Sequence, residues 1–181
     1  GVTWVCYGIE GGNKNIRDKV SKGQFDSSRI ERAVKMTYDA GLYIIGNFMF
    51  GLPNDTFESM QETLDLARKI KCEYANFYCT MAYPGSKLYE DAVVEGIELP
   101  EDWMGYSQYS TNALPMATKY LTSAQVLKFR DDAFYEYFSD PDYLKMITEK
   151  FGQATADHIQ EMMSHRIDRK ILSSDTSAVR V

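Results

Sequence analysis

Several features that mark particular classes of protein are scarce in this sequence of 181 residues. No apolar run approaches the ~20 residues that a membrane-spanning helix needs, so no membrane partner is expected. The net charge is −6, whereas proteins that bind nucleic acid normally carry a basic face, so no nucleic-acid partner is expected either. Nothing at the start of the chain has the pattern of a secretory signal peptide.

Cysteine and histidine are also rare. Three cysteines, Cys6, Cys72 and Cys79, cannot form a closed set of disulfides, and we expect reduced, buried thiols in a cytoplasmic protein. His158 and His165 lie seven residues apart in a predicted helix. Two turns separate such side chains by about 10 Å, which is too far for one shared metal ion. The sequence therefore predicts no metal site.

What the chain does contain is a threefold repetition of one local pattern. An apolar, β-branched or aromatic segment is followed each time by turn-forming residues and then by a helical pattern. This alternation predicts a parallel sheet with right-handed helical crossovers. Ligands of such folds bind at the carboxyl ends of the strands, so we look for function there. The three segments are Val2–Ile9 before Gly11-Gly12, Tyr43–Phe50 before Gly51-Leu52-Pro53, and Tyr74–Tyr83 before Pro84-Gly85.

Capping signals place helices after these strands and through the rest of the chain. Residues 15–22 are predicted to form a short helix or turn, and residues 98–120 a long loop with no clear period. After that loop we expect three helices: one to Phe138, one from Asp140-Pro141 to Gly152, and one from Thr155 to Leu172, before a frayed tail. The predicted helix starts are Ser28 with Glu31, Asp55 with Glu58, Ser86, and Thr122 with Gln125, and the predicted stops include Gly41 and Gly96.

Three motifs in this order resemble a known family. They are Gly8-Ile9-Glu10-Gly11-Gly12, the stretch from Gly46 to Thr56 with Gly51-Leu52-Pro53 at its centre, and Ala82-Tyr83-Pro84-Gly85-Ser86. Together they resemble the second half of the core domain of radical S-adenosylmethionine (radical SAM) enzymes, in the branch that often carries an N-terminal cobalamin-binding domain. The resemblance implies an α/β fold: a partial (βα) barrel fragment with three parallel strand–helix units of a (βα)6 core, followed by a helical tail.

The resemblance also implies a division of the chain. Residues 1–97 would be the C-terminal half of the partial barrel, residues 98–120 a long loop, and residues 121–181 a helical extension. The family's cluster motif, Cys-x-x-x-Cys-x-x-Cys, is absent from this sequence. We therefore expect a piece of a longer enzyme that is inactive alone and lacks the N-terminal half of its barrel. The strand edge exposed at Val2–Ile9 is expected to be covered by the helical tail or by a second copy, as a homodimer.

For the full-length protein, the resemblance implies reductive cleavage of S-adenosylmethionine (SAM) by a 4Fe-4S cluster to give a 5′-deoxyadenosyl radical. Methyl transfer through cobalamin is a variant of this function. The small-molecule substrate is unknown, and no catalytic residue is predicted within the sequence. Two alternatives remain: a different (βα) barrel enzyme that binds a phosphate or sugar at the strand ends, and a non-catalytic interaction domain.

Cofactor contacts are predicted at each strand end. The carboxylate of Glu10 would accept hydrogen bonds from the ribose or amino group of SAM, and Gly11 and Gly12 would let the cofactor approach the backbone. Alternatively, Glu10 is a capping or solvent-facing acid. Tyr83 would present its ring at the rim, or else pack under the next loop.

The resemblance implies that the central strand lies beside the adenine. The residues concerned are Asn47, Met49, Phe50, Gly51 and Leu52, with the backbone from Phe50 to Leu52 reading the edge of the base. Ordinary barrel core is the alternative for these side chains. Asn76, Tyr78 and Thr80 alternate along the third strand and would share one face. If that face is the barrel interior they would be polar groups near a substrate; the alternative is buried polar residues that hydrogen-bond to one another.

Overall fold

A computed structural model describes residues 1–13 and 27–174 of the chain. The elements in order are β1 (Trp4–Glu10), α2 (Ser27–Asp39), β2 (Tyr43–Phe50), α3 (Phe57–Ile70), β3 (Tyr74–Cys79), α4 (Lys87–Glu95), α5 (Ser123–Phe138), α6 (Pro141–Phe151), α7 (Gln153–Ser164) and α8 (Lys170–Ser174). None of these helices is long and apolar enough to cross a membrane. The helix or turn predicted for residues 15–22 and the end of the predicted tail lie outside the described residues.

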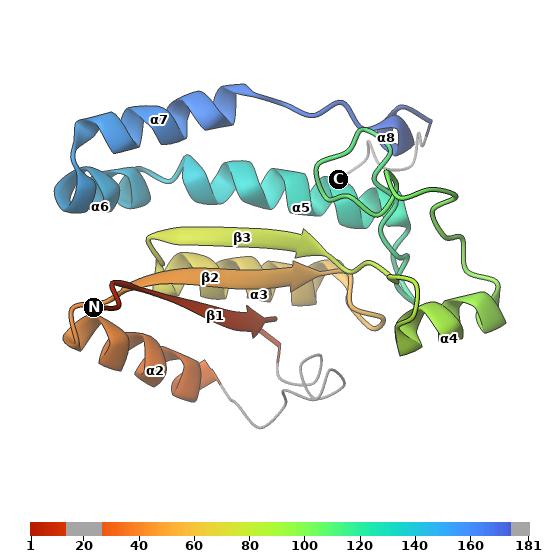
Figure 1. Ribbon diagram of the computed structural model, residues 1–181, viewed down its shortest axis with the longest axis horizontal. Helices are drawn as coiled ribbons and strands as arrows, with labels where there is room; N and C mark the ends of the chain where they lie inside the picture. The colour runs from red at the N-terminus through yellow and green to blue at the C-terminus, as the bar shows by residue number, and fades with distance from the viewer. Residues whose placement is uncertain (14–26, 175–181) are drawn as a thin grey trace.

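The three strands form one parallel sheet in the order β1-β2-β3. In Figure 1 all three arrows point the same way, toward α4 and the long loop that follows it. The predicted parallel arrangement is thus confirmed. The residues after each strand lie at a common end of the sheet, as expected from the alternation of strands and helices.

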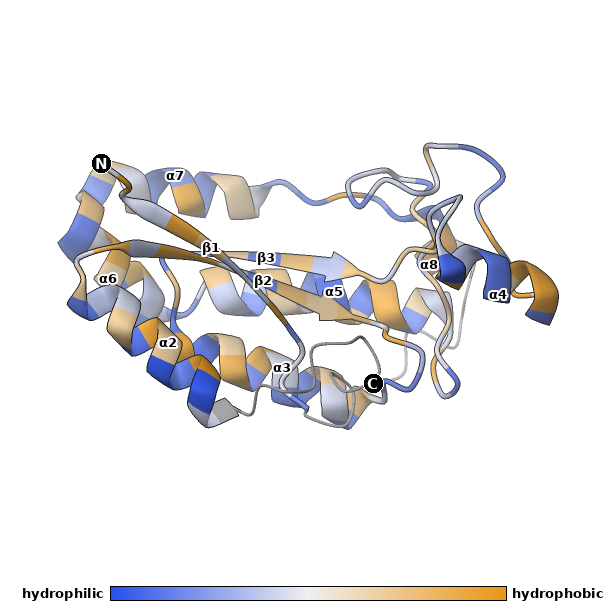
Figure 2. Ribbon diagram, turned by 60° about the horizontal axis from the view of Figure 1, so that its bottom comes forward, coloured by the Kyte–Doolittle hydropathy of each residue, from blue (hydrophilic) through white to orange (hydrophobic). Residues whose placement is uncertain are grey.

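The two faces of the sheet have different surroundings. Along β2, every second side chain is buried, including Ile44, Phe48 and Phe50, because α2 and α3 pack on that face. Figure 2 shows both helices on this side of the sheet, with hydrophilic residues on the outer side of α2. Ile45 and Met49 alternate onto the opposite face and are only half-buried.

The two edges of the sheet also differ. Helix α5 packs along β3, and the guanidinium Nε of its Arg130 donates to the carbonyl of Phe77 at 2.8 Å. The side-chain amide of Gln108 brackets the backbone of Cys79, accepting from its N–H and donating to its carbonyl, both at 2.9 Å. Side chains therefore take the place of a further strand beside β3. On the other side, no strand among the described residues pairs with the outer edge of β1.

At the amino end of the strands, buried polar contacts join the helical extension to the sheet. Tyr137 of α5 donates to the carbonyl of Cys72 at 2.7 Å, and Tyr143 of α6 donates to the carbonyl of Glu73 at 3.0 Å. The fully buried carboxylate of Glu73 accepts from the N–H of Ile44 at 2.8 Å and pairs with Lys150. Two helices of the extension are thereby attached to the start of β3.

Several predicted boundaries were wrong. Helix α3 is capped by Thr56, whose side chain accepts from Ser59 N–H, because the predicted cap, Asp55, instead closes the preceding turn. Helix α2 begins at Ser27, so Ser28 lies inside it rather than at its cap. Strand β1 is half-exposed rather than buried, because it lies at the open edge.

The predicted last helix is divided into α7 and α8. The break follows from Arg169, which makes two hydrogen bonds to the carboxylate of Asp131 in α5, at 2.8 and 2.9 Å. In addition, Lys170 N–H donates to the carbonyl of Thr111 in the long loop at 3.0 Å. These contacts hold the connection between α7 and α8 against α5 and the long loop. A continuous helix would not follow this path.

Candidate functional site

A cavity of about 430 Å³ lies at the carboxyl ends of the strands, and we call it the rim pocket. Its volume is within the range of small-molecule sites, and its lining is mostly apolar with a few polar groups, which is also typical of such sites. The lining comes from all three strand ends, from α4 and from the long loop. The residues are Glu10, Met49, Leu52, Tyr78, Cys79, Thr80, Met81, Tyr83, Leu88 and Gln108.

Strand β1 ends in an unusual backbone conformation. Glu10 has φ of 66°, in the left-handed region that non-glycine residues rarely adopt. The register with β2 shifts between Gly8 and Glu10, which marks a bulge, and the N–H of Gly11 then donates to the carbonyl of Ile9 at 3.0 Å. Bulges and left-handed residues at strand ends redirect side chains and concentrate at functional sites. Here they place Glu10 at the rim pocket.

Strand β2 ends in a turn held from within. Asp55 accepts a hydrogen bond from Leu52 N–H at 2.8 Å and another from the Ser59 hydroxyl at 2.6 Å. Burial raises the pKa of this carboxyl group, and its hydrogen bonds offset part of that effect. The carbonyl of Phe50 is also engaged, because Thr80 N–H donates to it at 2.8 Å. The turn is therefore rigid, with Leu52 at the pocket wall.

Strand β3 ends against the long loop. Gln108 fixes the loop to Cys79, and Met116 N–H donates to the carbonyl of Thr80 at 3.0 Å. Tyr83 stacks on Tyr106, with ring centroids 5.8 Å apart, and stays 48% exposed. The ring of Tyr83 therefore packs on the long loop, as one interpretation expects; Tyr83 also lines the rim pocket, and its contact with a cofactor stays a prediction.

The structure brings four of the nine predicted cofactor-contact residues to the rim pocket: Glu10, Met49, Leu52 and Tyr83. The other five, Gly11, Gly12, Asn47, Phe50 and Gly51, lie nearby but do not line it. Gly12 has a packing role, because a Cβ there would come within 2.4 Å of the Glu62 carbonyl oxygen in α3. Its N–H donates to the Thr63 hydroxyl at 2.9 Å.

Asn47 belongs to a polar row on the half-exposed face of the sheet. Its Nδ2 donates to the sulfur of Cys6 at 3.0 Å, and its Oδ1 accepts from Nδ2 of Asn76 at 2.9 Å. The row crosses all three strands, because residue 47 is opposite residue 76 in the register. Asn76 and Tyr78 are half-buried on this face, as the alternation predicts, whereas Thr80 is buried.

Sequence reasoning missed several residues of the rim pocket. Leu88 follows the predicted cap Ser86, so the sequence predicts that it lies on a helix, but it does not predict that Leu88 approaches the strand ends. No sequence pattern indicates a role for Gln108, because it lies in a loop without periodicity and its partners are backbone groups 29 residues away. Nothing in the sequence distinguishes Met81 and Cys79 from ordinary core residues.

The cysteines do not suit an iron–sulfur cluster. Cys6 is exposed on β1, so the prediction of a buried thiol there was wrong, whereas Cys72, just before β3, and Cys79, at its end, are buried. Burial raises the pKa of both Cys72 and Cys79 to about 12, so neither offers a thiolate near neutral pH. No three metal-ligating side chains gather anywhere in residues 1–13 and 27–174. The described residues therefore provide no set of ligands for a cluster.

The chain is similar to proteins named as methyltransferases, although no family model matches it. It is 32% identical over 149 residues to an uncharacterized methyltransferase of Pyrococcus horikoshii, covering 82% of this chain and 32% of that protein. It is 29% identical to a bacteriochlorophyllide d C-8(2)-methyltransferase of Chlorobaculum tepidum, over 66% of this chain and 26% of that enzyme. A cytidylyl-2-hydroxyethylphosphonate methyltransferase of Streptomyces wedmorensis is 24% identical, over 56% of this chain and 20% of that enzyme. The chain thus spans about a third or less of the length of these relatives.

Proposed function

We propose that this chain forms the carboxyl-terminal part of a radical SAM enzyme core, and that its rim pocket holds the nucleoside portion of SAM. The observation that carries the proposal is the meeting of Glu10, Met49, Leu52 and Tyr83 in one cavity, since these residues come from three separate motifs. The parallel direction of the strands and the similarity to methyltransferases support the same function.

Each of these residues has a role that its chemistry suits. The Glu10 carboxylate accepts hydrogen bonds from the ribose hydroxyls or the adenine amino group. Met49 and Leu52 provide apolar surface for the flat base, and the half-exposed ring of Tyr83 stacks on it. The rigid turn at Leu52, held by Asp55, keeps the pocket wall in place before the ligand binds.

In the whole protein, SAM held here would supply either a 5′-deoxyadenosyl radical, if a 4Fe-4S cluster held elsewhere reduced it, or, in a cobalamin-dependent variant, a methyl group. The ligands of that cluster come from outside this chain's described residues, since the cysteines lie far apart. This part of the enzyme binds and orients the nucleoside, and its long loop closes one side of the pocket.

The proposal is tested by titrating the 181-residue chain with SAM and following backbone amide signals by NMR. Saturable shifts at residues around Glu10, Leu52 and Tyr83 are expected. Glu10→Gln should weaken SAM binding about tenfold, because a hydrogen bond to a charged acceptor is lost. Glu90→Gln is the matched control, because Glu90 is exposed on α4 and lies outside the pocket.

Two results would count against this function. If Glu10→Gln and the parent chain bind SAM equally, the carboxylate has no role in the site. If ribose 5-phosphate raises the melting temperature and SAM does not, the alternative of a sugar- or phosphate-binding (βα) enzyme is favoured instead.

A second function, pairing through the edge of β1, is favoured by the contrast between the two sheet edges. Side chains satisfy the backbone at the outer edge of β3, whereas no described strand pairs with the outer edge of β1. We propose that the missing N-terminal half of the barrel pairs there, with a homodimer as the alternative. Light scattering separates the two. If the 181-residue chain is a dimer and a longer chain that includes the upstream strands is a monomer, barrel completion is supported. If the 181-residue chain is a monomer and its β1 amides exchange slowly with solvent, both proposals are contradicted.

A further inference from the structure

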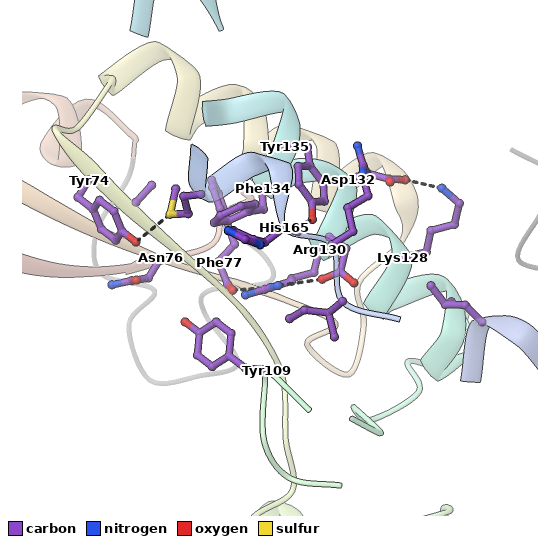
Figure 3. A pocket seen from close by; sticks show the side chains of 16 residues that line it. Tyr74, Asn76, Phe77, Tyr109, Lys128, Arg130, Asp132, Phe134, Tyr135 and His165 are labelled. Carbon is purple, nitrogen blue, oxygen red and sulfur yellow. Dashed lines mark hydrogen bonds and ion pairs between the residues drawn. The ribbon is translucent and has the colours of Figure 1, made fainter. Parts of the chain in front are cut away.

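A second cavity, of about 380 Å³, lies beside the edge of β3, and we call it the edge pocket. Its walls are β3, helix α5, the tip of the long loop at Tyr109, and the segment that joins α7 to α8 (Figure 3). Neither Glu10 nor any other acidic residue of the strand ends lines it. The edge pocket is therefore separate from the rim pocket.

The guanidinium of Arg130 lines the edge pocket while being only 5% exposed. Its Nε donates to the Phe77 carbonyl and its Nη1 to Asp131 Oδ1, both at 2.8 Å. Nη2 has no acceptor among the residues that the structure describes. A buried cation with unused donor capacity is costly unless an anion or another acceptor satisfies it.

Positive charge is in excess around this pocket. Asp131 is shared by two buried guanidiniums, because Arg169 makes two hydrogen bonds to the same carboxylate. Asp132 is paired with Lys128 at 2.5 Å. Arg166 has no ion pair within the described part of the chain, and its guanidinium lies 4.0 Å from the centroid of the Tyr135 ring. Three basic side chains, Lys128, Arg130 and Arg166, thus line the pocket with two carboxylates, and the buried Arg169 shares one of these, in a protein whose net charge is −6.

The remaining walls are aromatic. Figure 3 shows the Arg130 guanidinium between the rings of Tyr109 and Phe134, and its carbon lies 5.6 and 5.8 Å from the two ring centroids. Tyr109 is 64% exposed, so a ring bound at the mouth of the pocket can stack on it. Tyr74 lines the inner end, next to Asn76 of the polar row. Such walls favour a flat apolar body.

We propose that the edge pocket binds an anionic group, a carboxylate or a phosphate, carried on a flat aromatic body. The anion pairs with Arg130 Nη2 and Arg166, and the ring packs between Tyr109 and the Tyr135 side of the pocket. This inference rests on the pocket's own residues and does not depend on what the rim pocket holds.

The test uses three small probes of the same shape: benzoate, phenyl phosphate and the neutral benzamide. Each is titrated into the 181-residue chain while the Nε–Hε signal of Arg130 is followed by NMR. The anionic probes should shift this signal saturably, and benzamide should bind at least about tenfold more weakly, because charge-assisted hydrogen bonds are lost. The probe that binds more tightly, benzoate or phenyl phosphate, shows whether the site prefers a carboxylate or a phosphate. Equal binding of benzamide would overturn the proposal.

Variants that leave the fold intact sharpen the test. Arg166→Gln and Tyr109→Ala change exposed side chains, and each should weaken the better anionic probe about three- to tenfold. Arg68→Gln is the matched control, because Arg68 is half-exposed, pairs with Glu136 and lies outside the pocket. If Arg68→Gln weakens binding as much as Arg166→Gln, the probes respond only to overall charge and the site is refuted. SAM should leave the Arg130 signal unchanged, so a failure here is distinct from a failure at the rim.

Discussion

At the scale of single residues, Glu10 combines a strained backbone with a position in the lining of the rim pocket. Its φ of 66° lies where L-residues are disfavoured by about 1–2 kcal/mol relative to the right-handed region. The next residue, Gly11, would have tolerated that conformation at no such cost. Strain kept at a residue whose side chain faces a cavity is the pattern expected when the side chain is needed there.

We expect Glu10→Gly to be more stable than Glu10→Ala by about 1 kcal/mol, because glycine removes the conformational strain and alanine retains it. Urea unfolding of the two variants gives the comparison. Both should lose SAM binding equally, since neither has a carboxylate. Equal stabilities would mean that the left-handed conformation is not maintained in solution.

Asp55 gives a pH dependence whose sign can be stated. Burial raises its pKa in the folded state, so between the ordinary carboxyl pKa of about 4 and that raised value the folded protein binds more protons than the unfolded chain. The contribution of this carboxyl group to stability is therefore full below pH ~4 and is lost as the pH rises through the folded pKa.

Comparison with Asp55→Asn isolates this effect, because the amide does not titrate. The stability of the parent chain relative to the variant should fall between pH 4 and pH 7, as measured by urea unfolding at each pH. A relative stability that rises with pH would show that the hydrogen bonds from Leu52 and Ser59 outweigh burial.

At the scale of elements, the turn after β2 is fitted tightly against α5. Gly51 has φ of 78°, and a Cβ at this position would lie 2.5 Å from a methyl carbon of the buried Val126. Gly85 has a similar φ of 86°, but a Cβ there meets nothing within 4 Å. Substitution of Gly85 therefore tests backbone strain alone, whereas substitution of Gly51 tests backbone strain and steric overlap together.

Gly85→Ala should cost about 1 kcal/mol from backbone strain alone, and Gly51→Ala about 2–4 kcal/mol because overpacking is added. Thermal or urea unfolding measures both. Adding Val126→Ala to Gly51→Ala should cost less than the two single changes combined, because the second removes the clash. Strict additivity of the two would argue against the contact.

The elements that the sequence predicted well are those specified by local chemistry. Thr122 with Gln125 forms the expected capping box of α5, Ser86 caps α4, and Gly96 ends α4 in the left-handed conformation. The errors have two causes. Asp55 has the chemistry of a cap, yet its carboxylate accepts from Leu52 N–H three residues earlier, so two local roles compete. The break after α7 instead depends on a distant residue, Asp131, 38 residues from Arg169.

The candidate site divides in the same way. Glu10 and Leu52 were found because their motifs end predicted strands, and a parallel sheet brings strand ends together. Gln108 and the edge pocket around Arg130 depend on how the long loop and α5 fold back onto β3. No local sequence pattern predicts that the long loop and α5 pack against β3.

At the scale of the whole molecule, the sheet and the helical extension share buried contacts and should unfold as one unit. The hydroxyls of Tyr137 and Tyr143 donate to consecutive carbonyls at the start of β3, and both side chains are 1% exposed. Tyr137→Phe and Tyr143→Phe should each cost about 1–2 kcal/mol, because each leaves a buried carbonyl without its partner.

The measurement is urea unfolding followed by both circular dichroism and tyrosine fluorescence. The two signals should coincide in the parent chain and in both variants, as a single cooperative transition. Two separate transitions would show that residues 121–181 form an independent unit. Tyr135→Phe is a suitable control, because that hydroxyl donates to the carbonyl of His165 at an exposed position.

The capping of β3 by Gln108 and Arg130 has a consequence for biosynthesis. Both side chains follow β3 in the chain, so the ribosome releases the strand before the residues that satisfy its edge. At ~5–20 residues per second, the roughly fifty residues between β3 and Arg130 take about 3 to 10 s to emerge. During that interval the edge of β3 is without the side chains that later satisfy it, and a chaperone that masks this edge has its greatest effect then.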